Sequence, residues 1–140
     1  MGAPKRILIV DDEREFLFSA GVALKRAGYE VQTASNPRDA IGAILRAEAG
    51  KHPFDLLVTD LRMPEMSGAE LVGELKKRKV GLMVLAITSV REKGLLREMN
   101  CGRGADCLQK PFGPRELVER IGGIFSRGMP GSDFENAEYA

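Results

Sequence analysis

The chain has 140 residues, 44% of them apolar and 29% charged, a composition typical of one globular domain with a single core. Its formal net charge is +1, which excludes a broad basic field that would attract nucleic acid or an anionic membrane. No apolar run approaches the roughly 20 residues of a membrane span, and we expect no secretory leader. We therefore expect a cytoplasmic protein whose function depends on a local site.

The first third of the chain predicts a strand, a helix and a second strand. Residues 7–10 are an uninterrupted apolar run, which indicates a strand covered on both faces of a sheet. Apolar residues recur every three or four positions between 14 and 27 and predict a helix, for which Gly28 is a typical end. Residues 29–34 alternate between apolar and polar and predict a less buried strand.

The middle of the chain repeats this order. Asn36 followed by Pro37 is a typical helix start, and it predicts a helix that runs to about residue 49. Residues 56–59 form a second continuous apolar run and predict a buried strand. Residues 66–77 predict a helix that ends in a basic cluster, as suits a helix C-terminus.

The last third predicts strands at 82–87 and 107–109 and helices at 91–100 and 114–126, with Gly94 weakening the first of these helices. Strict alternation of strands and helices implies a doubly wound α/β domain, with a parallel sheet of five strands and helices on both faces. We expect this domain to occupy residues 1–127. Residues 128–140 lose apolar periodicity, so they are expected to be a flexible tail or the start of a linker.

Chemically active side chains directly follow four of the five predicted strands. Asp11 and Asp12 follow the first strand, Asp60 the third, Thr88 the fourth and Lys110 the fifth. Ligands of open α/β sheets bind beyond the carboxyl ends of the strands. We therefore expect these side chains to converge at one edge of the sheet.

Three carboxylates at one edge predict a cation and a phosphoryl group. Close carboxylates repel one another and have raised pKa values unless a cation is bound. A site with only a few protein oxygen ligands leaves coordination positions open. Such a site favours Mg²⁺, which keeps several of its bound waters. One carboxylate could then attack phosphorus to form an acyl phosphate, while Lys110 and Thr88 are suited to donate to the phosphoryl oxygens.

Each of these residues also has a purely structural interpretation. Asp12 fits a helix N-cap with an acidic residue three positions later. Asp60 could belong to a simple strand-to-loop turn, Thr88 could cap the next helix, and Lys110 could be a solvated lysine before a turn. Their coincidence at one sheet edge favours the functional interpretation.

The motifs Asp11-Asp12, Asp60, Thr88 and Lys110-Pro111-Phe112 resemble the site of the response-regulator receiver family, as does the loop with Met63-Pro64 and Gly68. The resemblance covers about residues 5–127. It implies a flavodoxin-like sheet order 2-1-3-4-5. It also implies a phosphorylation switch, rather than an enzyme with turnover on a diffusible substrate.

The resemblance implies a role for each acidic residue. Asp60 would accept the phosphoryl group. Asp12 would bind Mg²⁺ directly and Asp11 largely through water, and the backbone carbonyl of Arg62 would be a further protein ligand. The side chain of Arg62 would either reach a phosphoryl oxygen or lie exposed in solvent.

The remaining site residues would serve the phosphoryl group itself. Lys110, joined to Pro111 by a cis peptide bond, would contact a phosphoryl oxygen. Thr88 would move toward the phosphoryl group, and the small Ser89 would leave the access path open.

Partners and output also follow from the resemblance. The phosphodonor would be a sensor histidine kinase or a phosphotransfer protein. The phosphoryl charge would then bias the face formed by the fourth helix, fifth strand and fifth helix. The residues expected to report this change are Arg91, Glu92, Leu95, Cys107 and Phe112. We expect no membrane or direct nucleic-acid partner, and either a monomer or a phosphorylation-dependent homodimer.

Cys107 departs from the family, which often has Tyr or Phe at this position. Cys101 and Cys107 form neither a disulfide framework nor, with His52, a metal-site spacing, so we expect reduced thiols. Passive filling of space by Cys107 is favoured over a redox role. This departure keeps open a degenerate receiver that acts as a docking module without phosphorylation.

Two enzyme or cofactor classes compete with a receiver. A magnesium-dependent phosphatase of related fold would need a cap over its substrate, and the chain has no insertion long enough for one. A flavodoxin-like nucleotide or flavin binder would need a phosphate-binding loop after the first strand. The acidic run 11–13 would instead repel phosphate.

Overall fold

The structure is a computed structural model of the chain, and it describes residues 3–88 and 105–127. The strands are β1 (Arg6–Val10), β2 (Glu30–Ala34), β3 (Leu56–Asp60), β4 (Met83–Thr88) and β5 (Asp106–Gln109), and the described helices are α1 (Arg14–Arg26), α2 (Pro37–Ala49), α3 (Gly68–Lys77) and α5 (Pro114–Arg127). The helix predicted at 91–100 and the tail at 128–140 lie outside the described residues.

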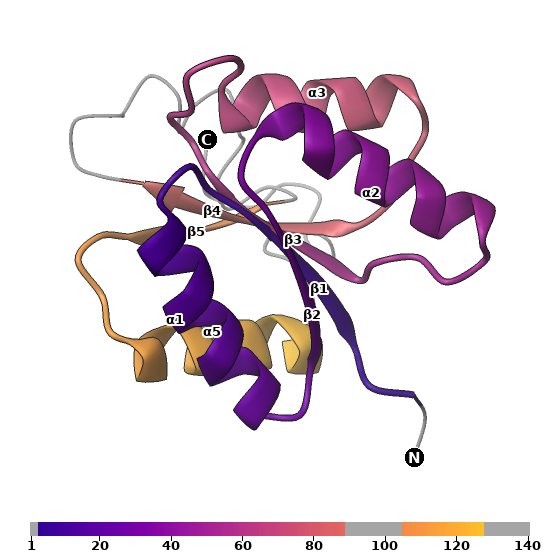
Figure 1. The fold of residues 1–140 in the computed structure, drawn as a ribbon. Helices are drawn as coiled ribbons and strands as arrows, with labels where there is room; N and C mark the ends of the chain where they lie inside the picture. Colours follow the sequence, from indigo (N-terminus) through magenta and orange to yellow (C-terminus); the bar gives the residue numbers. More distant parts are fainter. Residues whose placement is uncertain (1–2, 89–104, 128–140) are drawn as a thin grey trace, which may run out of the picture.

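The five strands form one parallel sheet in the order β2-β1-β3-β4-β5. Helices α1 and α5 cover one face of this sheet, and α2 and α3 cover the other (Figure 1). The predicted fold class and sheet order are therefore confirmed. None of the described helices has both the length and the apolar character needed to cross a bilayer.

Alternate residues of the central strands supply the two halves of the core. Leu8 and Leu57 belong to the cluster beneath α2 and α3, whereas Ile7, Ile9 and Val58 belong to the cluster beneath α1 and α5. All five side chains are fully buried. This is the burial expected when helices cover both faces of a parallel sheet, and it holds the carboxyl ends of β1 and β3 rigidly side by side.

The helix starts agree with the sequence, with one correction. The side chain of Asn36 accepts a hydrogen bond from the N–H of Asp39 (2.8 Å), as expected for the N-cap of α2. Helix α3 begins at Gly68 rather than at residue 66. Ser67 and Glu70 form a reciprocal capping box there, and this pair, not the apolar pattern, sets the first turn.

Candidate metal centre

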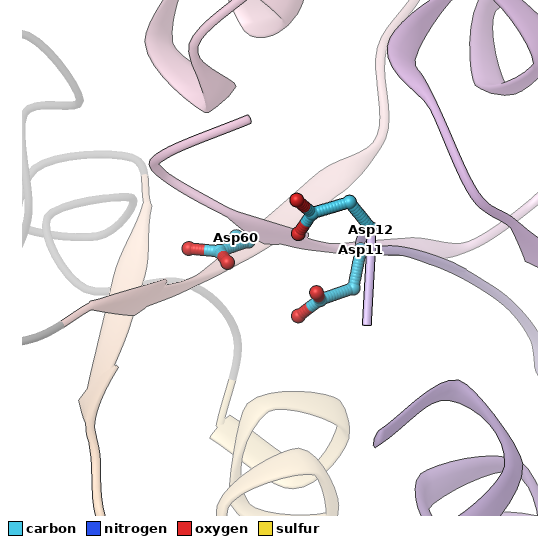
Figure 2. A group of neighbouring side chains, drawn as sticks. All are labelled: Asp11, Asp12 and Asp60. Carbon is cyan, nitrogen blue, oxygen red and sulfur yellow. The ribbon is translucent and has the colours of Figure 1, made fainter. Parts of the chain in front are cut away.

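Strand order brings three carboxylates together. β1 and β3 are neighbours, with Val10 opposite Thr59, so the residues that follow lie side by side at the carboxyl edge. Carboxylate oxygens of Asp11, Asp12 and Asp60 all lie within 4.8 Å of one another (Figure 2). The predicted convergence of the acidic residues is confirmed.

The three carboxylates differ in exposure. Asp11 is completely buried and Asp60 is 8% exposed, whereas Asp12 is exposed. The pair of Asp11 and Asp60 therefore forms a floor, and Asp12 lies at the solvent side. A cation or a phosphoryl group can approach from that side while the carboxylates of Asp11 and Asp60 stay largely dehydrated.

Asp11 has an unusual electrostatic position. Its Oδ1 accepts a hydrogen bond from the N–H of Glu13 (2.8 Å), but its buried Oδ2 has no hydrogen-bond partner among the described residues. The pKa of Asp11 is raised to about 6, chiefly by burial and also by the charge of Asp60, while the hydrogen bond from Glu13 opposes the rise. An orphaned carboxylate oxygen beside two other carboxylates fits a hard divalent cation.

Lys110 joins the site from the end of β5. Its Nζ lies 3.7 Å from Asp60 Oδ2 and 3.4 Å from Glu13 Oε1. Burial lowers the pKa of Lys110, but the charges of Asp60, Asp11 and Glu13 outweigh burial and raise it above the ordinary value. The ammonium group is therefore positively charged at neutral pH and faces the acidic floor. The Lys110–Pro111 peptide bond is cis, as expected.

Thr88 and Arg62 complete the set of predicted residues. Thr88 is buried at the end of β4, and its carbonyl accepts a hydrogen bond from the N–H of Lys110 (2.7 Å). The backbone N–H of Arg62 donates to Asp60 Oδ1 (3.1 Å), while the residue itself is exposed. The structure thus places Thr88, Lys110 and Arg62 at the same sheet edge as the carboxylates. Ser89 lies outside the described residues.

Glu13 is a site residue that the sequence analysis missed. It occupies the N-cap position of α1, where its side chain makes no capping hydrogen bond and instead pairs with Lys110. The interpretation of Asp12 as the N-cap is therefore wrong. The signal was available, since Glu13 directly follows the Asp11-Asp12 pair, but the link to Lys110 depends on tertiary structure.

Cys107 also differs from expectation. It is partly buried against the core on the α2 and α3 side, and it is disulfide-bonded. No cysteine of the described residues is free, so the prediction of a reduced thiol is wrong at this position. The prediction rested on the usual redox compartment and on sequence spacing, and neither of these shows whether the fold brings two sulfur atoms within bonding distance. Cys101 lies outside the described residues.

Gly68 is needed because the loop after Asp60 closes tightly. A Cβ atom at Gly68 would lie 2.5 Å from the backbone oxygen of Asp60 and 3.2 Å from Leu61 Cα. We expect Gly68→Ala to lower the free energy of unfolding by about 1–2 kcal/mol, because backbone atoms must move apart. Urea denaturation measures this change.

Gly73→Ala is the matched control for Gly68, in the middle of the same helix. A Cβ at Gly73 meets no atom within 4 Å, so alanine should stabilise α3 by about 0.5–1 kcal/mol. Equal effects of the two substitutions would contradict the close approach at Gly68.

Comparison with known proteins identifies the family. The family described as response regulator receiver domain matches residues 7–122 of the chain. The chain belongs to this family. It is 33% identical over 138 residues to the alkaline phosphatase synthesis transcriptional regulatory protein PhoP of Bacillus subtilis strain 168, which covers 96% of this chain and 55% of that protein. The chain thus spans about half the length of the curated relatives it matches.

Solved receiver structures have the same fold. The CheY-like receiver domain protein of Methanospirillum hungatei JF-1 superposes with a TM-score of 0.72 at 30% identity, over 89% of this chain and 96% of that one. The response regulator TrrA of Thermotoga maritima, solved in complex with Mg²⁺-BeF, superposes with a TM-score of 0.68 at 28% identity, over 86% and 98%.

Membership of this family places the receiver domain in two-component signalling rather than among classical enzymes. Its acidic pocket of Asp11, Asp12 and Asp60 is consistent with a phosphoacceptor aspartate and a site of the kind that binds Mg²⁺.

Proposed function

We propose that this receiver domain accepts a phosphoryl group on Asp60, in the presence of Mg²⁺, from a phosphohistidine of a sensor kinase or phosphotransfer protein. One observation carries the proposal: the carboxylates of Asp11, Asp12 and Asp60 converge within 4.8 Å, and Lys110 Nζ lies 3.7 Å from Asp60. A lone acidic cluster would fit cation binding only. The added ammonium group supplies a donor where a phosphoryl oxygen would develop charge.

Four residues would hold the metal ion. They are the side chains of Asp11, Asp12 and Asp60 and the backbone carbonyl of Arg62. The orphaned Oδ2 of Asp11 supports this set, and so does the Mg²⁺-BeF complex of the relative TrrA. When bound, Mg²⁺ would neutralise the clustered carboxylates and one phosphoryl oxygen.

The chain's own residues would carry out the transfer. A carboxylate oxygen of Asp60 attacks phosphorus, so that a P–O bond forms as the P–N bond to imidazole breaks and the imidazole nitrogen keeps the electron pair. Lys110 donates to a phosphoryl oxygen. The hydroxyl of Thr88 donates to another, which draws the end of β4 toward Asp60. The movement responds to the phosphoryl oxygens, which carry a charge of about −1.5 to −2 in place of the carboxylate charge of Asp60.

We place the receiver domain at residues 1–127, in the cytoplasm, as a monomer or a phosphorylation-dependent homodimer without direct nucleic-acid or membrane binding. Its output would pass through the face formed by the fourth helix, β5 and α5. Cys107 lies in β5, and Phe112 lies in the loop between β5 and α5. Of the other proposed reporters, Arg91, Glu92 and Leu95 lie outside the described residues.

Asp60→Asn gives the direct test. The full chain is incubated with acetyl phosphate and Mg²⁺ and its intact mass is measured. We expect one labile phosphoryl group on the unaltered chain and none on Asp60→Asn, since an amide cannot form the acyl phosphate. Asp39→Asn, an exposed aspartate in the first turn of α2, should be labelled normally. Labelling of Asp60→Asn, or labelling that ignores a chelator, would refute the proposal.

An aromatic pair beside the site is suited to bind the phosphodonor protein. The rings of Phe16 and Phe112 meet edge to face, 6.0 Å apart, and Lys110 Nζ lies 5.8 Å from the Phe16 ring centroid. Both phenylalanines are partly exposed. A protein that brings a phosphohistidine to Asp60 must cover this pair, and aromatic residues commonly dominate such contacts.

We therefore expect Phe112→Ala to reduce phosphotransfer from a kinase by about tenfold and to leave labelling by acetyl phosphate unchanged. The measurement compares both rates, using any sensor kinase that labels the unaltered chain. Phe18→Ala is a matched control on the same helix as Phe16. It lies outside the pair and should alter neither rate. Equal loss with both phosphodonors would show that Phe112 supports the site rather than the partner.

A further inference from the structure

One edge of the sheet carries a groove that the phosphorylation site does not use. β2 is an edge strand, with β1 as its neighbour in the described sheet. Helices α1 and α2 flank it from opposite faces (Figure 1). A groove of about 620 Å³ lies along this edge and is lined by α1, β2 and α2.

Backbone groups of β2 face the groove. The N–H of Glu30 donates to the carbonyl of Lys5, just before β1 (3.0 Å). The carbonyl of Ala34 accepts from the N–H of Asp11, just after β1 (3.2 Å). Residues of a strand alternate in the side to which their backbone groups point. Val31 and Thr33 therefore direct their N–H and C=O groups toward the open edge, where an added strand can bind them.

The lining of the groove combines apolar surface with an excess of basic side chains. Phe18, Val22 and Val31 supply apolar surface, and Phe18 is 74% exposed, the large apolar side chain most open to solvent among the described residues. The charged residues of the lining are Arg14, Lys25, Arg46 and Asp39, three basic and one acidic. A complementary segment would be extended, with aromatic and acidic side chains and no basic ones.

The chain's own C-terminal segment has this composition and starts nearby. Helix α5 ends at Arg127, and its Phe125 ring lies 5.5 Å from the ring of Tyr29, the residue directly before β2. Residues 128–140 contain three acidic residues, two aromatic residues and neither Lys nor Arg. Extended, these residues can span roughly 40 Å, whereas a five-residue strand needs about 17 Å.

We infer that residues 128–140 bind along β2 in the same molecule, as an added strand whose acidic side chains face Lys25 and Arg46 and whose aromatic side chains cover Phe18. A short connection gives such a segment a millimolar effective concentration, so modest contacts suffice to hold it. The inference does not rest on phosphorylation of Asp60, and its test needs no phosphodonor.

Amide hydrogen exchange of the full chain at neutral pH, followed by NMR, tests the inference. The comparison is with a charge-reversed chain that carries the three substitutions Asp133→Lys, Glu135→Lys and Glu138→Lys. We expect the amides of Val31 and Thr33 to exchange about tenfold more slowly in the unaltered chain than in this variant. The amide of Gln32 already faces β1 and should exchange alike in both, as an internal reference. The matched control carries Glu48→Lys, Glu65→Lys and Glu119→Lys, on exposed helix and loop residues. It changes the net charge by the same amount, and its amides of Val31 and Thr33 should exchange as slowly as in the unaltered chain.

A charge swap sharpens the result. Lys25→Glu/Arg46→Glu should remove the protection of Val31 and Thr33 in the natural chain and restore it in the chain with the charge-reversed tail. Equal exchange of these two amides in the natural and the charge-reversed chain would overturn the inference. Protection that disappears on dilution would overturn it as well, because the occupant would then be a second copy.

Discussion

Lys110→Ala is expected to slow phosphorylation of Asp60 by acetyl phosphate about a hundredfold. In the structure Nζ of Lys110 lies 3.7 Å from Asp60 Oδ2. A small movement of the side chain would bring it into contact with an oxygen of a phosphoryl group on Asp60. Removing a preorganised donor from a site of developing charge commonly costs a factor of 10² to 10³ in rate. Intact mass measured over time, at saturating Mg²⁺, gives the initial rates to compare.

Magnesium binding separates this role from a merely structural one. Loss of the Lys110 charge leaves the carboxylates of Asp60, Asp11 and Glu13 without its attraction, so Lys110→Ala should bind Mg²⁺ at least as tightly as the unaltered chain. Lys51→Ala, in an exposed turn outside the site, should change neither quantity. Parallel loss of phosphorylation and Mg²⁺ binding in Lys110→Ala would indicate a disrupted site and contradict the donor role.

Periodicity was sufficient to predict most of the fold. The continuous apolar runs that became β1 and β3 are buried on both faces, and the alternating run that became β2 is the exposed edge strand. These patterns follow directly from whether helices cover both faces of a strand. Strand order does not follow from periodicity, and here it came from the family resemblance. The start of α3 was misplaced because Ser67 and Glu70 cap the helix through side-chain geometry.

The site was predictable to the extent that strand ends determine it. Asp11 and Lys110 directly follow a strand and Asp60 ends one, so parallel packing brings them to one edge. The role of Glu13 was not predicted because its partner Lys110 is 97 positions away in sequence, and such a pair forms only in the folded chain. The disulfide of Cys107 was not predicted for a related reason, because spacing in sequence does not show which sulfur atoms lie close together in the folded chain.

Asp11→Asn is expected to stabilise the folded domain above pH 6 while it weakens Mg²⁺ binding. In the folded state the pKa of Asp11 is raised from 3.8 to about 6, chiefly by burial. The folded protein therefore keeps a proton that the unfolded chain loses between about pH 4 and 6. Unfolding free energy, measured with a chelator present, should fall by roughly 2–3 kcal/mol as pH rises through this window and then level off. The neutral asparagine should remove this fall.

The opposite sign of the two effects makes Asp11→Asn decisive. Asparagine can still accept the hydrogen bond from Glu13, but it lacks the charge that repels Asp60 and attracts a cation. Mg²⁺ affinity at neutral pH should therefore drop at least about tenfold, while the urea midpoint in chelator rises. Glu65→Gln, an exposed carboxyl in the following loop, should leave both unchanged. Destabilisation of the chelated protein by Asp11→Asn would contradict this prediction. It would show that Asp11 supports the fold, and that binding a cation does not gain free energy by neutralising an unfavourable buried charge.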